Sequence, residues 1–393
     1  MTEWKTYRLG DIASFSQGIQ VDIDKQLPYK KGGYVRFIRI VDFTKANEPY
    51  RYIETPKKQY LTNNGDIVMI RYGSQTAGLV VKSFEGAIAN NMFKITLDEQ
   101  VVDRDFIYYA LSQEDIFSSL RNAQSSSTMP AITFEIASRI QLKIPSLEEQ
   151  RRIAGILSAI DDKIENNRRI NTNLELQAQA LFEELICDEN LKYEYIANLE
   201  HIIETGRRPK GGVANIVNGV PSIGAENIKG LGKYDYSKTK YITEEFAQSL
   251  KKGFIKGYEL LIYKDGGKPG YFIPNFSIFG EGFPYDKMAL NEHVFLLDFG
   301  NKGYNFFAYF FFQTEEVMRY LNAQGSKAAI PGINRNDVES IAIPTIENKT
   351  VKEFCKRVEP IITAILTNAK ESSRLATLRD TLLPKLMNGE IKL

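Results

Sequence analysis

The chain has 393 residues, of which 43% are hydrophobic and 25% are charged, and its formal net charge is +1. These values are typical of a globular protein of two or three domains and exclude a uniformly basic nucleic-acid binder. No apolar run approaches the ~20 residues of a membrane span. The opening sequence MTEWKTYRLG has no apolar signal core, so we expect a cytoplasmic protein without a membrane partner.

Cysteine and histidine are rare, with two residues of each type scattered along the chain. This scatter gives no zinc-binding pattern, and we expect no metal site. We expect Cys187 and Cys355 to be buried free thiols, as in proteins of a reducing compartment.

Residues 1–145 are expected to form a mixed α/β globular domain. Short apolar or alternating segments between Gly and Asn turns predict strands, and a segment with helical periodicity and a polar loop follow them. The predicted strands are Tyr34–Ile40, Asp66–Ile70, Gly78–Val81 and Met92–Thr96, the helix is Phe106–Leu120 and the loop is Asn122–Thr128.

A single long helix is predicted from Pro145 to Ile186. Apolar residues recur along it in alternating steps of four and three, which is the pattern of a helix that packs along a partner helix. Asn167 and Asn171 interrupt this apolar series. Polar residues in such a seam fix the register of a helix pair and weaken it.

The second half of the chain repeats the first. Residues 191–344 show the same order of segments, with Asn291–Leu297 in the place of Asn91–Leu97 and a helix at Phe306–Leu321. The helical series returns ~200 positions later within residues 345–393, which identifies the partner helix by its repeat.

The second helix is expected to be less regular than the first. Asn368 and Ser372 occupy its polar positions, and Arg379 matches its counterpart poorly. Pro360 predicts a kink and Pro384 predicts a break, followed by a cap at Asn388-Gly389.

These features predict an α+β protein. Two similar mixed α/β globular domains, 1–145 and 191–344, are joined by two long helices, in 146–190 and 345–393. The helices are expected to form an antiparallel coiled coil, and the whole is expected to have a pseudo-twofold internal repeat.

Motifs for common catalytic classes are missing from the sequence. There is no GxxxxGK[ST], no GxGxxG between a strand and a helix, no GxSxG and no nuclease pattern of carboxylates and lysine. We therefore expect no catalytic residue and no cofactor in this chain.

Binding loops are the remaining candidates. The segment from Arg71 to Thr76 follows a strand and combines a cation with glycine, hydroxyl and amide groups, which can meet phosphates or base edges. A solvated hairpin loop is the alternative. The matching loop of the second domain begins at Lys264. The candidate DNA-contacting residues are Gln17, Arg36, Arg39, Arg71, Tyr72, Ser74, Gln75, Lys82, Ser125 and Ser126 in the first domain, and Arg207, Arg208, Lys210, Lys264, Gly266, Lys268, Gln324, Ser326 and Lys327 in the second.

In these features the chain resembles the specificity (S) subunit of a Type I restriction–modification system. The resemblance rests on the duplicated architecture and on specific phrases. The second helix departs from it, because Ile346-Glu347-Asn348-Lys349 replaces the Leu147-Glu148-Glu149-Gln150 of the first. The phrases are W…RLGDIASFSQG (4–18), GDIVMIRYGSQTAG (65–78), IPSLEEQRRIAGILSAIDDKIENNRRI (144–170) and LRDTLLPKLMNGEIKL (378–393).

The resemblance implies a non-catalytic subunit that binds double-stranded DNA at a bipartite site. Each globular domain would be a target recognition domain for one half, and the helices would set the spacer and dock two methyltransferase (M) subunits. S-adenosylmethionine would be bound by those partners, and ATP and Mg by restriction (R) subunits where these are present.

Two other hypotheses remain open. The chain could be a coiled-coil scaffold for protein assembly without DNA sequence specificity. It could also be a fused nuclease or methyltransferase with an unfamiliar motif, in which case the isolated chain would be active with Mg²⁺ or S-adenosylmethionine.

Overall fold

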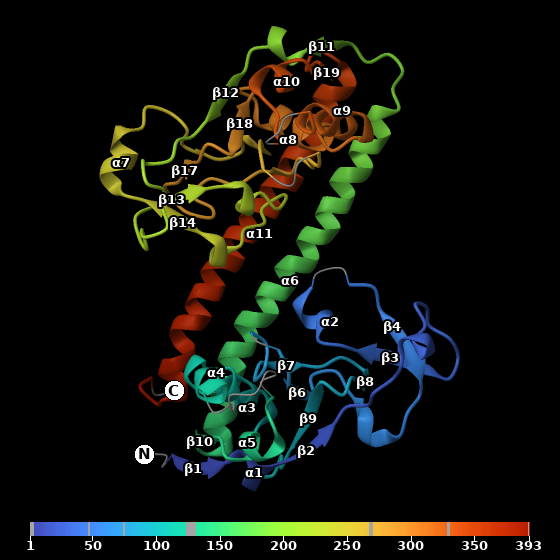
Figure 1. Cartoon of the computed structure of the whole chain (residues 1–393), viewed down its shortest axis with the longest axis vertical. Helices are drawn as coiled ribbons and strands as arrows, with labels where there is room; N and C mark the ends of the chain where they lie inside the picture. The colour runs from blue at the N-terminus through green and yellow to red at the C-terminus, as the bar shows by residue number, and fades with distance from the viewer. Residues whose placement is uncertain are drawn as a thin grey trace. The chain divides into compact units, whose positions relative to one another are not determined.

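The computed structural model describes residues 4–45, 48–73, 75–122, 131–266, 270–327, 331–391 and 393 (Figure 1). The chain falls into two compact units, Met1–Asp162 with Thr377–Leu393, and Lys163–Ala376. Each unit contains one globular domain and a segment of each of two long helices, α6 (Leu147–Ile186) and α11 (Lys349–Met387).

Two four-stranded sheets build the first domain, in the orders β2-β9-β6-β7 and β4-β3-β8-β5. A separate antiparallel pair, β1 with β10, joins the segments that enter and leave the domain. The strands are β1 (Lys5–Arg8), β2 (Ala13–Gln17), β3 (Tyr34–Ile38), β4 (Arg51–Glu54), β5 (Leu61–Thr62), β6 (Ile67–Ile70), β7 (Val80–Lys82), β8 (Gly86–Ile88), β9 (Met92–Leu97) and β10 (Gln141–Ile144).

The sequence of β6 is a continuous apolar run because both faces of this strand are buried. Ile67 and Met69 pack into one core cluster, while Val68 and Ile70 pack into another on the opposite face. A strand that is covered on both faces needs apolar residues at every position rather than at alternate ones. Leu157 of α6 and Leu386 of α11 complete the first of these clusters.

The predicted helix Phe106–Leu120 is wrong as a single element, because the chain forms two helices there. The first helix stops at Leu111, and the hydroxyl of Ser112 donates to the carbonyl of Tyr108 at 2.7 Å, which favours a helix end over continuation. The helices of this domain are α1 (Leu9–Ile12), α2 (Val41–Thr44), α3 (Arg104–Leu111), α4 (Glu114–Asn122) and α5 (Phe134–Ser138).

The second domain repeats this plan. Its sheets have the orders β12-β18-β15-β16 and β14-β13-β17, and β11 pairs with β19 as β1 does with β10. Its elements are β11 (Tyr193–Tyr195), β12 (Ile202–Thr205), β13 (Val220–Ile223), β14 (Lys240–Ile242), α7 (Glu244–Ser249), β15 (Leu260–Tyr263), β16 (Phe276–Ser277), β17 (Ala289–Leu290), β18 (Val294–Asp298), α8 (Lys302–Phe311), α9 (Glu315–Gly325), α10 (Arg335–Glu339) and β19 (Ala342–Pro344). The predicted helix Phe306–Leu321 is likewise divided in two.

The strand registers correct the predicted alignment of the two domains. Parallel pairing joins Ile38 to Ile88 in one domain and Ile223 to Leu290 in the other. Counting from these pairs, Asn91 corresponds to His293 and not to Asn291. The coincidence of Ala89 with Ala289 and of Asn91 with Asn291 favoured an alignment that is two positions out of register.

The two long helices lie antiparallel in each unit, which confirms the predicted coiled coil. In the first unit, Arg379 forms an ion pair with Asp161 at 2.8 Å, so the poor sequence match at Arg379 is a cross-helix contact. In the second unit, Asn167 Nδ2 donates to Glu371 at 2.7 Å. There, Asn368 Nδ2 also donates to Asn171 Oδ1 at 2.9 Å.

The predicted break at Pro384 is wrong, because α11 continues to Met387. Pro360 also lies inside the continuous helix. Both prolines are on its exposed face, where water can reach the carbonyl groups that lose an intrahelical donor. The helix ends where Gly389 adopts a φ of 70° and its N–H donates to the carbonyl of Leu386 at 3.2 Å.

Candidate nucleic-acid interface

In the first domain, polar side chains meet where β2 ends and β9 begins. Gln17 Nε2 donates to the carbonyl of Asn90 at 3.3 Å, and Asn90 Nδ2 donates to Gln20 Oε1 at 3.1 Å. The backbone N–H of Arg71 donates to the carbonyl of Asn91, so the segment after β6 joins the same place. We call this group the first strand-end junction.

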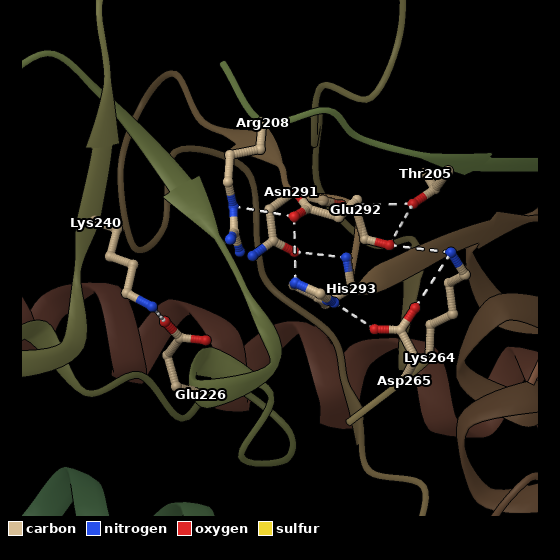
Figure 2. Close-up of polar contacts among 9 residues, drawn as sticks. All are labelled: Thr205, Arg208, Glu226, Lys240, Lys264, Asp265, Asn291, Glu292 and His293. Atoms are coloured by element: carbon tan, nitrogen blue, oxygen red, sulfur yellow. Dashed lines mark hydrogen bonds and ion pairs between the residues drawn. The ribbon is translucent and has the colours of Figure 1, made fainter. Parts of the chain in front are cut away.

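The second domain has an equivalent group at the same strand ends. Thr205 Oγ1 donates to the carbonyl of Glu292 at 3.3 Å, and Arg208 Nε pairs with Glu292 Oε1 at 3.0 Å. Lys264 Nζ also donates to the carbonyl of Glu292, at 3.1 Å. Figure 2 shows these side chains converging on Glu292, and we call the group the second strand-end junction.

A histidine organises the second junction. His293 contacts Asp265 through Nδ1 and Glu292 Oε1 through Nε2, the latter at 3.2 Å (Figure 2). Its backbone N–H donates to Oδ1 of the buried Asn291 at 2.9 Å. Among the described residues, the buried Oε2 of Glu292 has no hydrogen-bond partner. This carboxylate is therefore held on one oxygen and left unsatisfied on the other.

Glycines bring the backbones together at both junctions. A Cβ added to Gly18 would lie 2.2 Å from the carbonyl oxygen of Ala89. A Cβ added to Gly206 would lie 1.6 Å from the carbonyl oxygen of Leu290. Since these neighbours are backbone atoms, no rotamer change can relieve the overlap, and only glycine permits the approach.

A further ion pair lies near the second junction, between Lys240 and Glu226 (Figure 2). Burial disfavours the charged carboxylate, but the hydrogen bond and charge of Lys240 hold the pKa of Glu226 below its usual value. The ion pair thus favours the ionised form of Glu226.

Three predicted DNA-contacting cations of the first domain are engaged by their own domain. Arg36 stacks on Tyr50 at 3.9 Å and pairs with Asp42 at 3.5 Å. Arg39 pairs with Asp42 at 3.2 Å. Lys82 pairs with Asp105 at 2.8 Å. These contacts give each residue a role in packing the domain.

The loop after β6 contacts the segment that precedes α5, and the loop after β15 contacts the segment that precedes α10. Tyr72 forms a β-bridge with Ala131, and Arg71 Nε donates to the carbonyl of Ile132 at 3.3 Å. In the second domain, the N–H of Gly266 donates to the carbonyl of Pro331 at 2.9 Å, with a φ of 131° at Gly266. Both loops are therefore anchored at corresponding points.

The remaining predicted DNA-contacting residues lie outside the two strand-end junctions. Gln75, Arg207 and Lys210 are exposed. The predicted loop Asn122–Thr128 begins with the last residue of α4, and the predicted loop Asn322–Lys327 is wrong in its first part, because Asn322 to Gly325 form the end of α9. Lys327 Nζ donates to Gln324 Oε1 at 2.8 Å, and Ser326 is the C-cap of the helix. Ser74, Ser125, Ser126 and Lys268 lie outside the described residues.

Sequence reasoning missed several members of the junctions. Gln20 and Thr205 were not among the candidates, and neither were Asn90, Asp265, Glu292 and His293. The misaligned repeat hid them, because it compared Asn91 with Asn291 and left the Asn90–Glu292 pair unrecognised. The signal that could have found them is the run Asn-Glu-His directly before an apolar strand, with a basic loop after the first strand of the same sheet.

The two cysteines have different surroundings. Burial raises the pKa of Cys355 to about 12 and leaves an inert thiol. Cys187 is exposed, so the prediction that both thiols are buried is wrong for this residue, which follows the last residue of α6. Within the described ranges, no group of three or more His, Cys, Asp or Glu residues could hold a metal ion. None of the described helices is long and apolar enough to cross a membrane.

Comparisons with known proteins find similar proteins of one kind. Residues 1–176 match the model of the Type I restriction modification DNA specificity domain. The Type I restriction enzyme MjaIX specificity subunit of Methanocaldococcus jannaschii is 24% identical over 320 residues, covering 77% of this chain and 72% of that protein. The HindI specificity subunit of Haemophilus influenzae is 22% identical over 475 residues, covering 100% of each.

A solved structure shows the same fold. The crystal structure of a Type-I restriction-modification system S subunit from M. genitalium covers 98% of this chain, with 96% of its own chain matched, a TM-score of 0.62 and 16% identity. The domain match defines the class, a protein with a Type I DNA specificity domain. Together with the full-length likeness, it makes this chain similar to the specificity subunits of Type I restriction–modification systems.

Proposed function

We propose that this chain is a non-catalytic specificity subunit that recognises a bipartite DNA site, with one half read by each globular domain. The observation that carries the proposal is the pair of strand-end junctions. Two domains that share a four-stranded sheet of the same strand order present polar side chains at the same strand ends, with different residues in each. This is the arrangement expected of two domains that share a fold and recognise different DNA sequences.

The charge distribution supports direct readout over bulk electrostatic binding. With 50 basic and 49 acidic residues, the chain has no global excess of positive charge to attract the DNA backbone. Exposed cations such as Arg207 and Lys210 provide local phosphate contacts, which position a protein on DNA without reading its sequence. Amide, guanidinium and carboxylate groups at the junctions provide the donors and acceptors that distinguish base edges.

The two long helices are proposed to set the spacer between the half-sites and to dock two methyltransferase subunits. Polar contacts such as Asn171 with Asn368 support the first role, because they allow one register of the pair and penalise a slipped one. S-adenosylmethionine would be held by the methyltransferase subunits, and ATP and Mg²⁺ by restriction subunits if these join. Such a complex acts on chromosomal DNA, so we place it in the cytoplasm.

The competing function is a helical scaffold without DNA sequence specificity. Such a scaffold would need the helix pair but would give no reason for two equivalent polar junctions on the attached domains. It predicts that the assembled complex binds random and target duplexes with equal affinity.

The test is methylation sequencing of genomic DNA from cells that carry the methyltransferase genes, with and without this chain. We expect a bipartite adenine motif that is methylated when the chain is present and unmodified without it. A methylation pattern that does not depend on the chain, with the partner subunits expressed, would contradict the proposal.

A further inference from the structure

The two strand-end junctions contain a pair of side chains at equivalent positions. In the first domain the pair is Gln20 with Asn90, joined by a hydrogen bond of 3.1 Å. In the second domain it is Arg208 with Glu292, joined at 3.0 Å between Nε and Oε1. The same two places in the fold are thus occupied by two neutral amides in one domain and by an ion pair in the other.

Strand registers establish the equivalence independently of these contacts. Gln17 pairs with Phe93, and Thr205 pairs with Phe295, at the last residue of the corresponding strands β2 and β12. A glycine follows each of these residues, and Gln20 and Arg208 each come two residues after that glycine. On the other side, the parallel β-pairs place Asn90 and Glu292 each two residues after Ile88 or Leu290.

Both pairs have a side chain that is accessible to a ligand. Gln20 is exposed, and the side chains of Arg208 and Glu292 are 39% and 35% accessible. Arg208 uses its Nε toward Glu292, and among the described residues its two terminal nitrogens have no hydrogen-bond or ion-pair partner. These nitrogens form a free fork of donors, whereas the Gln20 amide offers N–H donors and an oxygen that already accepts one hydrogen bond from Asn90.

His293 and Asp265 hold the carboxylate that pairs with the Arg208 guanidinium. Glu292 Oε1 also contacts His293, and His293 contacts Asp265, so the carboxylate that orients Arg208 is itself held in place (Figure 2). The basic groups that contact Glu292 are Arg208 and His293 at the carboxylate and Lys264 at the backbone carbonyl. A guanidinium with a fixed Nε and free terminal nitrogens is suited to a planar acceptor pair.

We propose that Arg208 reads a guanine and Gln20 reads an adenine at corresponding positions of the two half-sites, with Glu292 and Asn90 as positioning residues. A guanidinium fork matches O6 and N7 of guanine, and a carboxamide matches N6 and N7 of adenine, in the major groove. This inference rests on the proposed function. It adds the base chemistry of one position in each half-site.

The experiment uses the complex of the full chain with its methyltransferase subunits and a panel of duplexes. Each duplex carries the motif of the unmodified chain with one base pair replaced in turn. The variants are the double exchanges Arg208→Gln with Glu292→Asn, and Gln20→Arg with Asn90→Glu. Arg319→Gln, on an exposed and paired arginine of α9, is the matched control.

We expect the first exchange to change the preference at one position of the second half-site from G·C to A·T, by 10-fold or more in affinity. The second exchange should change one position of the first half-site from A·T to G·C. The other half-site and the spacer should stay as they are, and Arg319→Gln should leave the whole profile unaltered.

Unchanged profiles in both exchanges, or a uniform loss across all duplexes, would overturn the inference. If the exchanged proteins do not assemble, Arg208→Lys decides, because it keeps the charge and removes the fork. A loss of discrimination at one position supports the inference, and an unaltered profile overturns it. A complex of the unmodified chain that prefers no bipartite motif would instead contradict the proposed function itself.

Discussion

The two globular domains share an arrangement of strands, which we call the frame. They differ in the side chains at the strand-end junctions of this frame. Each has one four-stranded sheet of the same strand order, the same parallel pair between two short strands and a glycine at the same strand exit. At the junctions, the first domain presents the amides of Gln20 and Asn90, and the second presents Arg208, Glu292 and His293. The difference shows that the same arrangement of strands can carry different polar side chains at its junction.

This comparison separates variants by what they should change. Variants of the shared frame should lower stability in either domain, and variants of a junction should alter binding with little effect on stability. The following changes test the frame, from the largest expected effect to the smallest.

Gly206→Ala should be the most damaging frame variant, because the new Cβ would lie 1.6 Å from a backbone oxygen. We expect a loss of about 3 kcal/mol in the free energy of unfolding, measured by chemical denaturation. Gly18→Ala should cost less, since its overlap distance is 2.2 Å. Gly155→Ala is the control, because nothing lies within 4 Å of its added Cβ and it sits in a helix, where alanine is favoured. Equal stability of Gly206→Ala and Gly155→Ala would show that the strand exits are not constrained as described.

Asn167→Asp should weaken the helix pair by about 2 kcal/mol. Asn167 is 1% exposed and donates to Glu371, so the change buries a negative charge beside another carboxylate. The neighbouring Asn166 is exposed, and Asn166→Asp should stay within ~0.5 kcal/mol of the parent chain. Denaturation of both variants provides the measurement, and an equal effect on the two would argue against a buried polar seam.

Glu165→Gln should have the smallest effect. Hydrogen bonds from Arg168, opposed by slight burial, and from Arg169 lower the pKa of Glu165 to about 2. Because the folded pKa is depressed, the stabilisation is present above the ordinary pKa of 4.5 and is lost as the pH falls toward 2. The side chain is 40% exposed, so solvent screening limits the contribution to less than ~1 kcal/mol at neutral pH.

The measurement is the difference in unfolding free energy between the parent chain and Glu165→Gln from pH 7 to pH 3. The difference should shrink as the pH falls below 4.5. Glu183→Gln, which removes a carboxylate that accepts a hydrogen bond from the neutral Gln179, is the control variant in the same helix. A difference that grows on acidification would contradict the assigned pairing.

Much of the fold follows from local patterns in the sequence. The helix pair was predictable because its seven-residue repeat persists through ~40 residues and recurs in the second half. The division of the helix at Ser112 and the continuity of α11 through Pro384 were not, because both depend on tertiary contacts and exposure that outweigh local propensity.

The junctions were only partly predictable, for a different reason. Arg71 and Lys264 were found because each follows a strand with an apolar sequence that is easy to identify. Glu292 and His293 reach the junction through the pairing of strands that are far apart in the chain. A two-residue error in the alignment of the repeat hid this pairing. Arg36 and Arg39 were counted as DNA contacts because sequence shows a charge but not its internal partner.

The most direct test of one reader per domain is a chimera in which residues 191–344 are replaced by residues 1–145, assembled with the methyltransferase subunits. Methylation sequencing should then give a bipartite motif that contains the first half-site twice, in inverted orientation, with the spacer of the parent chain. A motif that keeps the second half-site of the parent chain would contradict the account, because it would place that specificity outside the second domain.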